Sequence, residues 1–298
     1  MNSDISVIRD AADLALQCRD FADTEVLGSV GSTNQYLLDQ RPAGLSRPRF
    51  VWTHVQTHGR GRRGRVWVGP PQHSLMFSMQ FLREIRSQSG TQPRVALTGL
   101  PIAVGVTLAE SLCAYSPGVR LKWPNDLQCA GRKFGGILIE TRHLVIPGSG
   151  NAGLPDARID RGVPVEQVEQ VVIGVGLNLY VEPAWQRSIG QPVCGLFDTS
   201  DYPLRATIAA RLARSLCDAW LQFQIDGVAA FVSRWSNWDA LFGLDVRVLD
   251  GERILLEGVA SGLSPAGTLL VQTEAGQKEV SFGDVSVRSS SPENYPEH

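Results

Sequence analysis

The residues best suited to chemistry in this sequence are a run of arginines and two isolated lysines. Gly59–Arg65 reads GRGRRGR, with four arginines in seven residues. Only three of the 28 basic residues are lysines, and two of them, Lys122 and Lys133, lie in the stretch KWPNDLQCAGRKFGGILIE (122–140). Guanidinium groups bind carboxylates and phosphates through forked hydrogen bonds, and an ammonium binds them as a compact point charge. The pattern therefore indicates a site for an anionic substrate.

The arginine run also fits three other interpretations. A G-x-G-x-x-G dinucleotide site needs a helix after the glycines, and Pro70-Pro71 cannot continue one. A nucleic-acid patch is weakened by the formal net charge of −2, which gives no overall basic field. A solvated turn is the common outcome for a charge run, but the interleaved glycines favour a mobile loop that orders over an anion.

The elements that must position these residues can be predicted from periodicity and turn residues. Ser32 and Gln35 form the pattern of a capping box that opens a helix. Gly174–Asn178 ends an apolar strand with two glycines and an amide. We expect strands at 49–56, 74–81, 118–123, 137–140 and 170–180, and helices at 4–21, 94–114, 204–225 and 227–238. The Gly/Pro/Asp-rich residues 142–165 predict an exposed loop. From Gly243 onward, short strand patterns with turn residues predict a small β-barrel.

Composition narrows the class of protein. The 298 residues, of which 43% are hydrophobic and 19% charged, are typical of a soluble protein with one large and one small domain. No apolar run reaches the roughly 20 residues of a membrane-spanning helix, and no secretory signal is seen. Five cysteines without a C-x-x-C pair predict reduced, mostly buried thiols. We therefore expect a cytoplasmic protein that binds neither membrane nor DNA.

Four sequences in fixed order, STNQYLL, GRGRRGRVW, KWPNDL…GRKFGGIL and IGVGLNL, strongly resemble those of the biotin protein ligases. The resemblance runs from about Gly28 to Arg288. It implies an α+β fold, in which a mixed β-sheet flanked by helices is followed by a small SH3-like β-barrel. It also implies a helical segment at 1–21, a catalytic domain at 22–240, the SH3-like domain at 241–290 and a tail at 291–298. The first segment is too short for a helix-turn-helix domain, so the chain resembles the monofunctional type, for which a homodimer is possible.

The resemblance implies ATP and biotin as substrates, together with Mg²⁺. The biotin carboxylate and ATP give biotinyl-5′-AMP and pyrophosphate, and a lysine of a biotin carboxyl carrier protein then displaces AMP. Preorganised cations are needed because a carboxylate and an α-phosphate repel each other. Two alternatives are a lipoate or octanoate ligase of the related fold and a nucleic-acid-binding protein that uses the arginine loop. The strings GRGRRGRVW and KWPND argue against the lipoate reading.

The resemblance also assigns residues to roles. Lys133 and Arg62 would act on the carboxylate and the phosphate, and Asp126 would orient the incoming lysine or Mg²⁺. The expected biotin-binding residues are Ser32, Thr33, Asn34, Gln56, Gly59, Arg60, Arg62, Lys133, Gly136 and Gly176. The expected ATP-binding residues are Arg62, Arg65, Trp67, Lys122, Asn125, Lys133, Asn178 and Arg288.

Several of these residues also have a structural interpretation. Ser32 fits a helix cap as well as a ligand contact, and Trp67 fits plain core. Asp126 could pair with Lys122 in a turn. His54 and His58 lie on a predicted strand and lack the glutamate of H-E-x-x-H, so we expect no metal site there.

The scarcity of lysine allows a direct test. We expect Lys133→Ala to abolish formation of biotinyl-AMP, because the ammonium that serves both the carboxylate and the phosphate is lost. Lys278→Ala, in the expected small barrel, should leave the activity nearly unchanged. Pyrophosphate release from biotin and ATP measures this step, and equal activity of the two variants would contradict the role given to Lys133.

Overall fold

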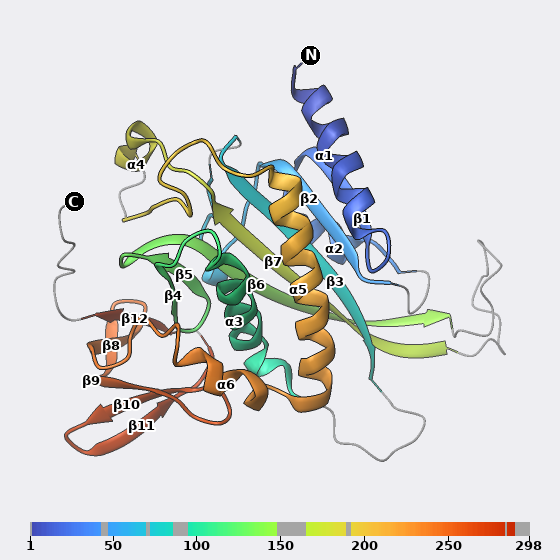
Figure 1. Cartoon of the computed structure of the whole chain (residues 1–298). Coiled ribbons are helices and arrows are strands. Elements are labelled where there is room, and N and C mark those ends of the chain that lie inside the picture. Colours follow the sequence, from blue (N-terminus) through green and yellow to red (C-terminus); the bar gives the residue numbers. More distant parts are fainter. Residues whose placement is uncertain are drawn as a thin grey trace.

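A seven-stranded sheet forms the main body of the computed structural model, which describes residues 2–42, 47–69, 72–85, 95–147, 165–188, 192–283 and 285–289 (Figure 1). Its strand order is β1-β2-β3-β7-β6-β5-β4. The strands are β1 (Asp23–Val30), β2 (Arg49–Gln56), β3 (Ser74–Glu84), β4 (Val119–Lys122), β5 (Asp126–Cys129), β6 (Arg132–Pro147) and β7 (Val165–Asn178). β1 and β2 are parallel and the other neighbouring strands are antiparallel, so the predicted mixed sheet is confirmed.

Helices cover both faces of this sheet. They are α1 (Asn2–Cys18), α2 (Thr33–Asp39), α3 (Leu100–Leu112), α4 (Pro183–Ser188), α5 (Arg205–Asp226) and α6 (Ala229–Trp235), with short 3₁₀ turns at Arg62–Gly64 and Leu97–Gly99. α3 and α5 pack against each other on one face, and α2 lies on the opposite face against β2, β3 and β7 (Figure 1). None of the helices in the described ranges is long and apolar enough to cross a bilayer.

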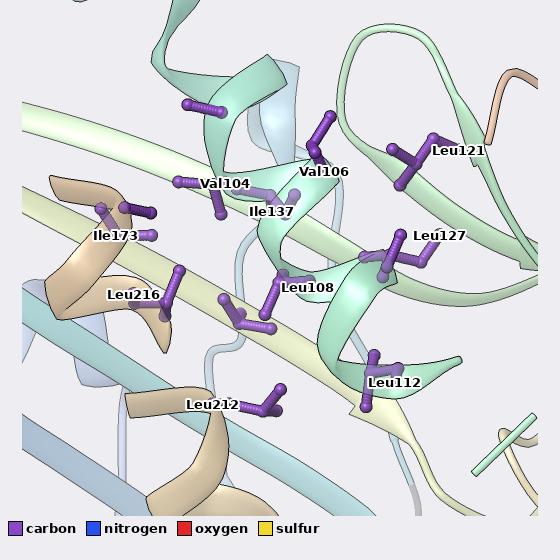
Figure 2. Packing of buried hydrophobic residues seen from close by; sticks show 14 of the residues in the cluster. Val104, Val106, Leu108, Leu112, Leu121, Leu127, Ile137, Ile173, Leu212 and Leu216 are labelled. Carbon is purple, nitrogen blue, oxygen red and sulfur yellow. The ribbon is translucent and has the colours of Figure 1, made fainter. Parts of the chain in front are cut away.

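The hydrophobic core lies between the sheet and the helices α3 and α5. Figure 2 shows Ile137 of β6 and Ile173 of β7 among Val104 and Leu108 of α3 and Leu212 of α5, all buried. A buried aliphatic side chain contributes roughly 1.5–3 kcal/mol, whereas an exposed ion pair contributes about 0–1 kcal/mol. Packing against α3 and α5 therefore stabilises the sheet from one face, and polar groups can occupy the opposite face.

A second sheet is formed by the C-terminal part of the chain. Its strands are β8 (Asp245–Asp250), β9 (Arg253–Leu263), β10 (Leu269–Thr273), β11 (Gly276–Val280) and β12 (Ser286–Ser289), paired antiparallel in the order β11-β10-β9-β8-β12. The Trp123 indole joins this sheet to the large one, because its Nε1 donates to the Gly267 carbonyl at 3.1 Å and its ring lies 5.3 Å from that of Phe282. The predicted short strands are confirmed, while closure into a barrel and the domain boundaries stay predictions.

Several expected boundaries differ from the structure, and the helices expected to end at 21 and 238 end at Cys18 and Trp235. The helix expected at 94–114 begins at Leu100, with Pro101 in its first turn, where a missing N–H costs nothing. Residues 142–147 were expected to form a loop, but they extend β6 and pair with 165–170 of β7. Their partners lie 18 to 28 positions away, so local turn residues did not reveal the hairpin. The rest of the expected loop, 148–164, and the tail at 291–298 lie outside the described residues.

A buried charged cluster anchors α1. The Asp10 carboxylate, 5% exposed, lies 2.9 Å from His54 Nε2 of β2 and accepts a hydrogen bond from Arg205 Nη2 of α5 at 3.3 Å. The Arg205 guanidinium also stacks 5.2 Å from the centre of the Trp52 ring. His54 therefore serves in packing α1 onto the sheet.

We expect Asp10→Ala to lower the free energy of unfolding by about 3 kcal/mol, because it removes the buried carboxylate that pairs with His54 and Arg205. Asp20→Ala is the matched control: its carboxylate, 75% exposed, pairs with a neighbouring arginine. That control should change stability by less than about 0.5 kcal/mol. Chemical denaturation of the three proteins measures both values, and similar losses in the two variants would contradict the anchoring role.

Candidate active site

One large cleft, with a volume of about 1300 Å³, opens on the sheet face opposite α3 and α5. Its walls are the first turn of α2, the arginine loop, the facing residues of β6 and β7, and β12 of the small sheet. A pocket for one small ligand usually has roughly 300–1000 Å³, so this cleft has room for two substrates. All residues predicted for catalysis or for binding biotin and ATP line it, with the exception of Gly59.

Glycines form part of the sheet surface at the cleft, at alternate positions 174 and 176 of β7 and at position 136 of β6. A Cβ on Gly174 would lie 2.2 Å from Asn34 Oδ1, and one on Gly176 would lie 2.5 Å from the Trp67 indole. A Cβ on Gly136 would meet both Lys133 Nζ and Trp67 at 3.4 Å. Side chains from other parts of the chain therefore lie directly against the backbone of the sheet.

Trp67 closes the base of the arginine loop. The backbone N–H of Trp67 donates to the Gly59 carbonyl at 2.9 Å. Arg60 and Val66 form an antiparallel β-bridge just inside this contact. A Cβ on Gly59 would lie 2.4 Å from the Trp67 carbonyl oxygen. Gly59 thus shapes the base of the loop and is not among the residues that line the cleft, while its role in biotin binding stays a prediction.

The reactive centre predicted from sequence is assembled around Lys133. Its ammonium lies 2.6 Å from Asp126 Oδ1 and 5.6 Å from the centre of the Trp67 ring. The Lys133 and Asp126 side chains are 31% and 29% exposed, so both can reach a ligand. Lys122 lies opposite Asp126 in the β4–β5 ladder, but the Asp126 carboxylate bonds to Lys133.

A tight hairpin brings Lys133 back beside Asp126. Ala130 and Gly131 both have positive φ, 47° and 70°, as a two-residue turn of right-handed twist requires. The register of β5 and β6 then shifts between Leu127 and Gln128, so that Gln128 faces Lys133 while Asp126 faces Gly136. Such a shift re-aims side chains at a strand edge.

Three of the four loop arginines are held by the protein. Arg60 Nη2 donates to both carboxylate oxygens of Glu140 at 3.1 and 3.2 Å. Arg62 donates to Asn125 Oδ1 at 3.2 Å and to the Gly283 carbonyl, and Arg63 donates to Asp250 Oδ1 at 3.2 Å.

Two cations of the cleft are open. Arg65 of the loop and Arg288 of β12 both line the cleft and are exposed. Within the described ranges, neither side chain makes a hydrogen bond or ion pair with the protein. They are thus available to an anionic ligand.

A hydrogen-bonded network lines the end of the cleft next to α2. Gln56 Oε1 accepts from the Thr33 N–H at 2.9 Å and from its hydroxyl at 3.2 Å. The Ser78 hydroxyl lies 2.7 Å from that of Thr33 and donates to Asn34 Oδ1 at 2.6 Å. Asn34 Nδ2 donates to the Leu138 carbonyl at 3.2 Å and to a carboxylate on β6 at 2.8 Å, so both of its donors are taken by the protein.

Ser32 is the N-cap of α2, and its hydroxyl accepts from the Gln35 N–H at 3.5 Å. The Gln35 side-chain amide donates forward to Asp39 Oδ1 at 2.6 Å. The cap is therefore confirmed, while the glutamine side chain of the expected capping box points to the next turn. Ser32 is 7% exposed and lines the cleft, so its ligand contact is compatible with the cap and stays a prediction.

Several lining residues were not identified from the sequence. Among them are Phe77, Trp123, Gln128, Leu138, Trp185 and Val193. Trp123 lies inside the KWPND string and Trp185 lies in a segment that showed no periodicity. Glu140, an acidic residue at the end of the apolar string GGILI, was the clearest signal overlooked.

The Cys194 thiol, which lies near Lys133, is poorly suited to act as a nucleophile. Burial raises the pKa of Cys194 to about 11, and its N–H donates to the Lys133 carbonyl at 3.0 Å. A thiol with so high a pKa is almost fully protonated at neutral pH and is a weak nucleophile. All five cysteines are free, and Cys18, Cys194 and Cys217 are buried, as predicted.

We expect Gly176→Ala to reduce adenylate formation by roughly 100-fold, because the new methyl group displaces Trp67 and with it the loop and Lys133. Gly28→Ala on β1 is the control, since its Cβ would meet nothing closer than 3.8 Å. Initial rates of pyrophosphate release, with thermal unfolding to verify folding, measure the effect. A Gly176→Ala protein as active as Gly28→Ala would contradict this packing.

Comparison with known proteins agrees with this geometry. Residues 26–149 match the Biotin/lipoate A/B protein ligase family and residues 242–288 match the Biotin protein ligase C terminal domain. The bifunctional ligase/repressor BirA of Escherichia coli is 32% identical over 272 residues, which cover 91% of this chain and 76% of that protein. The biotin--[acetyl-CoA-carboxylase] ligase of Paracoccus denitrificans is 28% identical over 266 residues, covering 87% and 98%.

A solved structure shares the fold. The biotin protein ligase from Aquifex aeolicus in complex with biotin and ATP superposes with a TM-score of 0.67 at 24% identity, covering 90% of this chain and 99% of that one. The chain belongs to the biotin protein ligase family.

Proposed function

We propose that this chain activates biotin with ATP as biotinyl-5′-AMP and transfers the biotinyl group to a lysine of a biotin carboxyl carrier protein. The observation that carries the proposal is the arrangement of one cleft. The same cleft is lined by the Lys133–Asp126 pair, a polar network at α2 and two open arginines, Arg65 and Arg288. Such a cleft suits a ligand with a polar ring at one end and a carboxylate that must meet a phosphate.

The ureido ring of biotin is assigned to the end of the cleft next to α2. Ser32, Thr33 and Gln56 offer hydroxyl and amide groups there, and the apolar side chains of Phe77 and Leu138 line the same cleft. Hydrogen-bonding groups within an otherwise apolar pocket give specificity, because a ligand without matching groups leaves them unpaired. Asn34, whose donors are occupied, supports this wall rather than donating to the ligand.

Activation requires two anions to approach each other. A carboxylate oxygen of biotin bonds to the α-phosphorus of ATP, and the bond from that phosphorus to the bridging oxygen breaks to release pyrophosphate. The Lys133 ammonium has three N–H donors, and one of them donates to the Asp126 carboxylate. The other two are free to stabilise the carboxylate and the charge that develops on the phosphate. Asp126 therefore orients Lys133, a role not anticipated from the sequence.

The nucleotide is assigned to the opposite end of the cleft. Arg65 and Arg288 supply positive charge for the phosphates, and Arg62 lies between them and Asn125 of the KWPND turn. Asn178 is 3% exposed, and its Oδ1 has no hydrogen-bond partner in the described structure. A buried orphan acceptor favours a donor such as the amino group of adenine. Trp185 and Val193 add apolar wall for the base.

Mg²⁺ has no protein cage in the described residues. They contain no group of three or more His, Cys, Asp or Glu side chains, and the Asp126 carboxylate is bound to Lys133. Mg²⁺ in nucleotide sites is commonly held by phosphate oxygens and water with few protein ligands. We therefore assign no step of the reaction to a metal bound by the protein.

In the transfer step, the neutral amine of the carrier lysine attacks the acyl carbon, AMP leaves, and the amine loses a proton. Lys133 occupies Asp126 Oδ1, and the second carboxylate oxygen is available to accept a hydrogen bond from the incoming amine. Relatives from Paracoccus denitrificans and Mycobacterium tuberculosis are named biotin--[acetyl-CoA-carboxylase] ligases, which favours the carrier of a biotin-dependent carboxylase as acceptor. The monofunctional type, a homodimer and a cytoplasmic location stay predictions.

Incubation with radiolabelled biotin, ATP and a carrier domain tests the proposal. We expect label on the carrier, equal release of AMP, and no label on a carrier whose acceptor lysine is replaced by arginine. The same assay with lipoate should give less than about one hundredth of the transfer, because its dithiolane ring does not match the hydrogen bonds at α2. Transfer of lipoate in place of biotin would overturn the substrate, and absence of any transfer would overturn the activity.

A further inference from the structure

A carboxylate on β6, Glu140, lies between the α2 wall of the cleft and the start of the arginine loop. Glu140 follows Gly136 and Leu138 at alternate positions of the strand, and both of those residues line the cleft. Because side chains alternate along a strand, the three share the face on which the cleft opens. The Glu140 side chain is 28% exposed.

Glu140 contacts two residues that are far apart in the sequence. Its Oε2 accepts from Asn34 Nδ2 at 2.8 Å, and both carboxylate oxygens accept from Arg60 Nη2 at 3.1 and 3.2 Å. Asn34 lies in the first turn of α2, at the wall of the cleft. Arg60 begins the arginine loop, where it forms a bridge with Val66. One carboxylate thus connects the wall and the loop.

The contact with Asn34 also determines which way its amide faces. Asn34 is 3% exposed, its second donor goes to the Leu138 carbonyl, and its Oδ1 accepts from Ser78. A flipped amide would place its N–H groups against Ser78 and its oxygen against Glu140, where two acceptors repel. The negative charge of Glu140 therefore stabilises both the amide orientation and the position of Arg60.

We propose that Glu140 is a positioning residue for biotin, acting through Asn34 and Arg60. It holds the α2 wall and the start of the arginine loop at a fixed separation and touches neither substrate. The inference rests on the proposed function, which assigns this wall to the ureido ring of biotin. The Arg60–Glu140 ion pair is only partly buried, so it contributes a modest interaction energy. The loss of Glu140 therefore weakens biotin binding without abolishing adenylate formation.

Glu140→Gln tests this role, because it keeps the size and an acceptor for Asn34 but removes the charge that holds Arg60. We expect the KM for biotin in pyrophosphate release to rise roughly five- to tenfold, while kcat and the KM for ATP stay within about twofold. Arg60→Gln should show the same pattern. The double variant should be no worse than the more affected single variant, because both changes remove one interaction.

Two further variants serve as controls. Glu257→Gln removes a comparable pair in the small sheet, where Arg247 Nε donates to Glu257 Oε1 at 2.7 Å, and should change none of the three constants. Glu140→Asp keeps the charge on a shorter arm and should have a biotin KM between those of the wild type and Glu140→Gln. Thermal unfolding of each variant shows whether it is folded.

A wild-type biotin KM in folded Glu140→Gln, or additive effects in the double variant, would overturn the proposal. If Glu140→Gln does not fold, the biotin KM values of Arg60→Gln and Arg60→Lys test the proposal instead. The proposal requires lysine to preserve the biotin KM better than glutamine, and a wild-type KM in Arg60→Gln refutes it. A wild-type chain that releases no pyrophosphate from biotin and ATP would instead refute the proposed function, so the two failures are distinguishable.

Discussion

The alternation of large and minimal side chains on β7 is the constraint on which the site depends. Ile173, Val175 and Leu177 face the core, while Gly174 and Gly176 face the cleft. The period of two along a strand makes this division unavoidable, because a shift of one residue would bury the glycines and expose the aliphatic side chains. One short segment therefore both secures the sheet to α3 and α5 and leaves space for the polar face.

The polar face is organised by pairing charges before any ligand arrives. Lys133 is held by Asp126, and Arg60 is held by Glu140. Cations that already have a fixed geometry lose little order when the reacting anions enter, which is the physical basis of electrostatic preorganisation. Arg65 and Arg288 differ, because their charges face the cleft without a protein partner in the described ranges. The arrangement separates cations that position groups from cations that are free to bind phosphate.

The small C-terminal sheet takes part in this organisation. Arg62 reaches the Gly283 carbonyl and Arg63 reaches Asp250, so the arginine loop is attached to that sheet at two points. Arg63 adopts a left-handed conformation, with φ at 60°, which a non-glycine residue adopts at some cost. The Trp123 contact with Gly267 joins the same sheet to the KWPND turn. The small sheet therefore contacts both the arginine loop and the KWPND turn, and it helps to position the two segments that carry the cations of the site.

Local patterns in the sequence were sufficient to identify the main helices, the family, and every strand of the large sheet except β1 and β5. They also pointed to a set of candidate site residues, all of which except Gly59 line the cleft. These features depend on periodicity and on short strings of fixed spacing, which can be read along the chain. Tertiary structure alone decided the partners: Asp126 bonds to Lys133 and not to Lys122, and Gly59 shapes the loop base. It also decided that β6 continues to Pro147 and that Glu140 joins Asn34 to Arg60. Such contacts depend on strand register, on a two-residue turn and on residues that are 80 or more positions apart, and no local pattern carries that information.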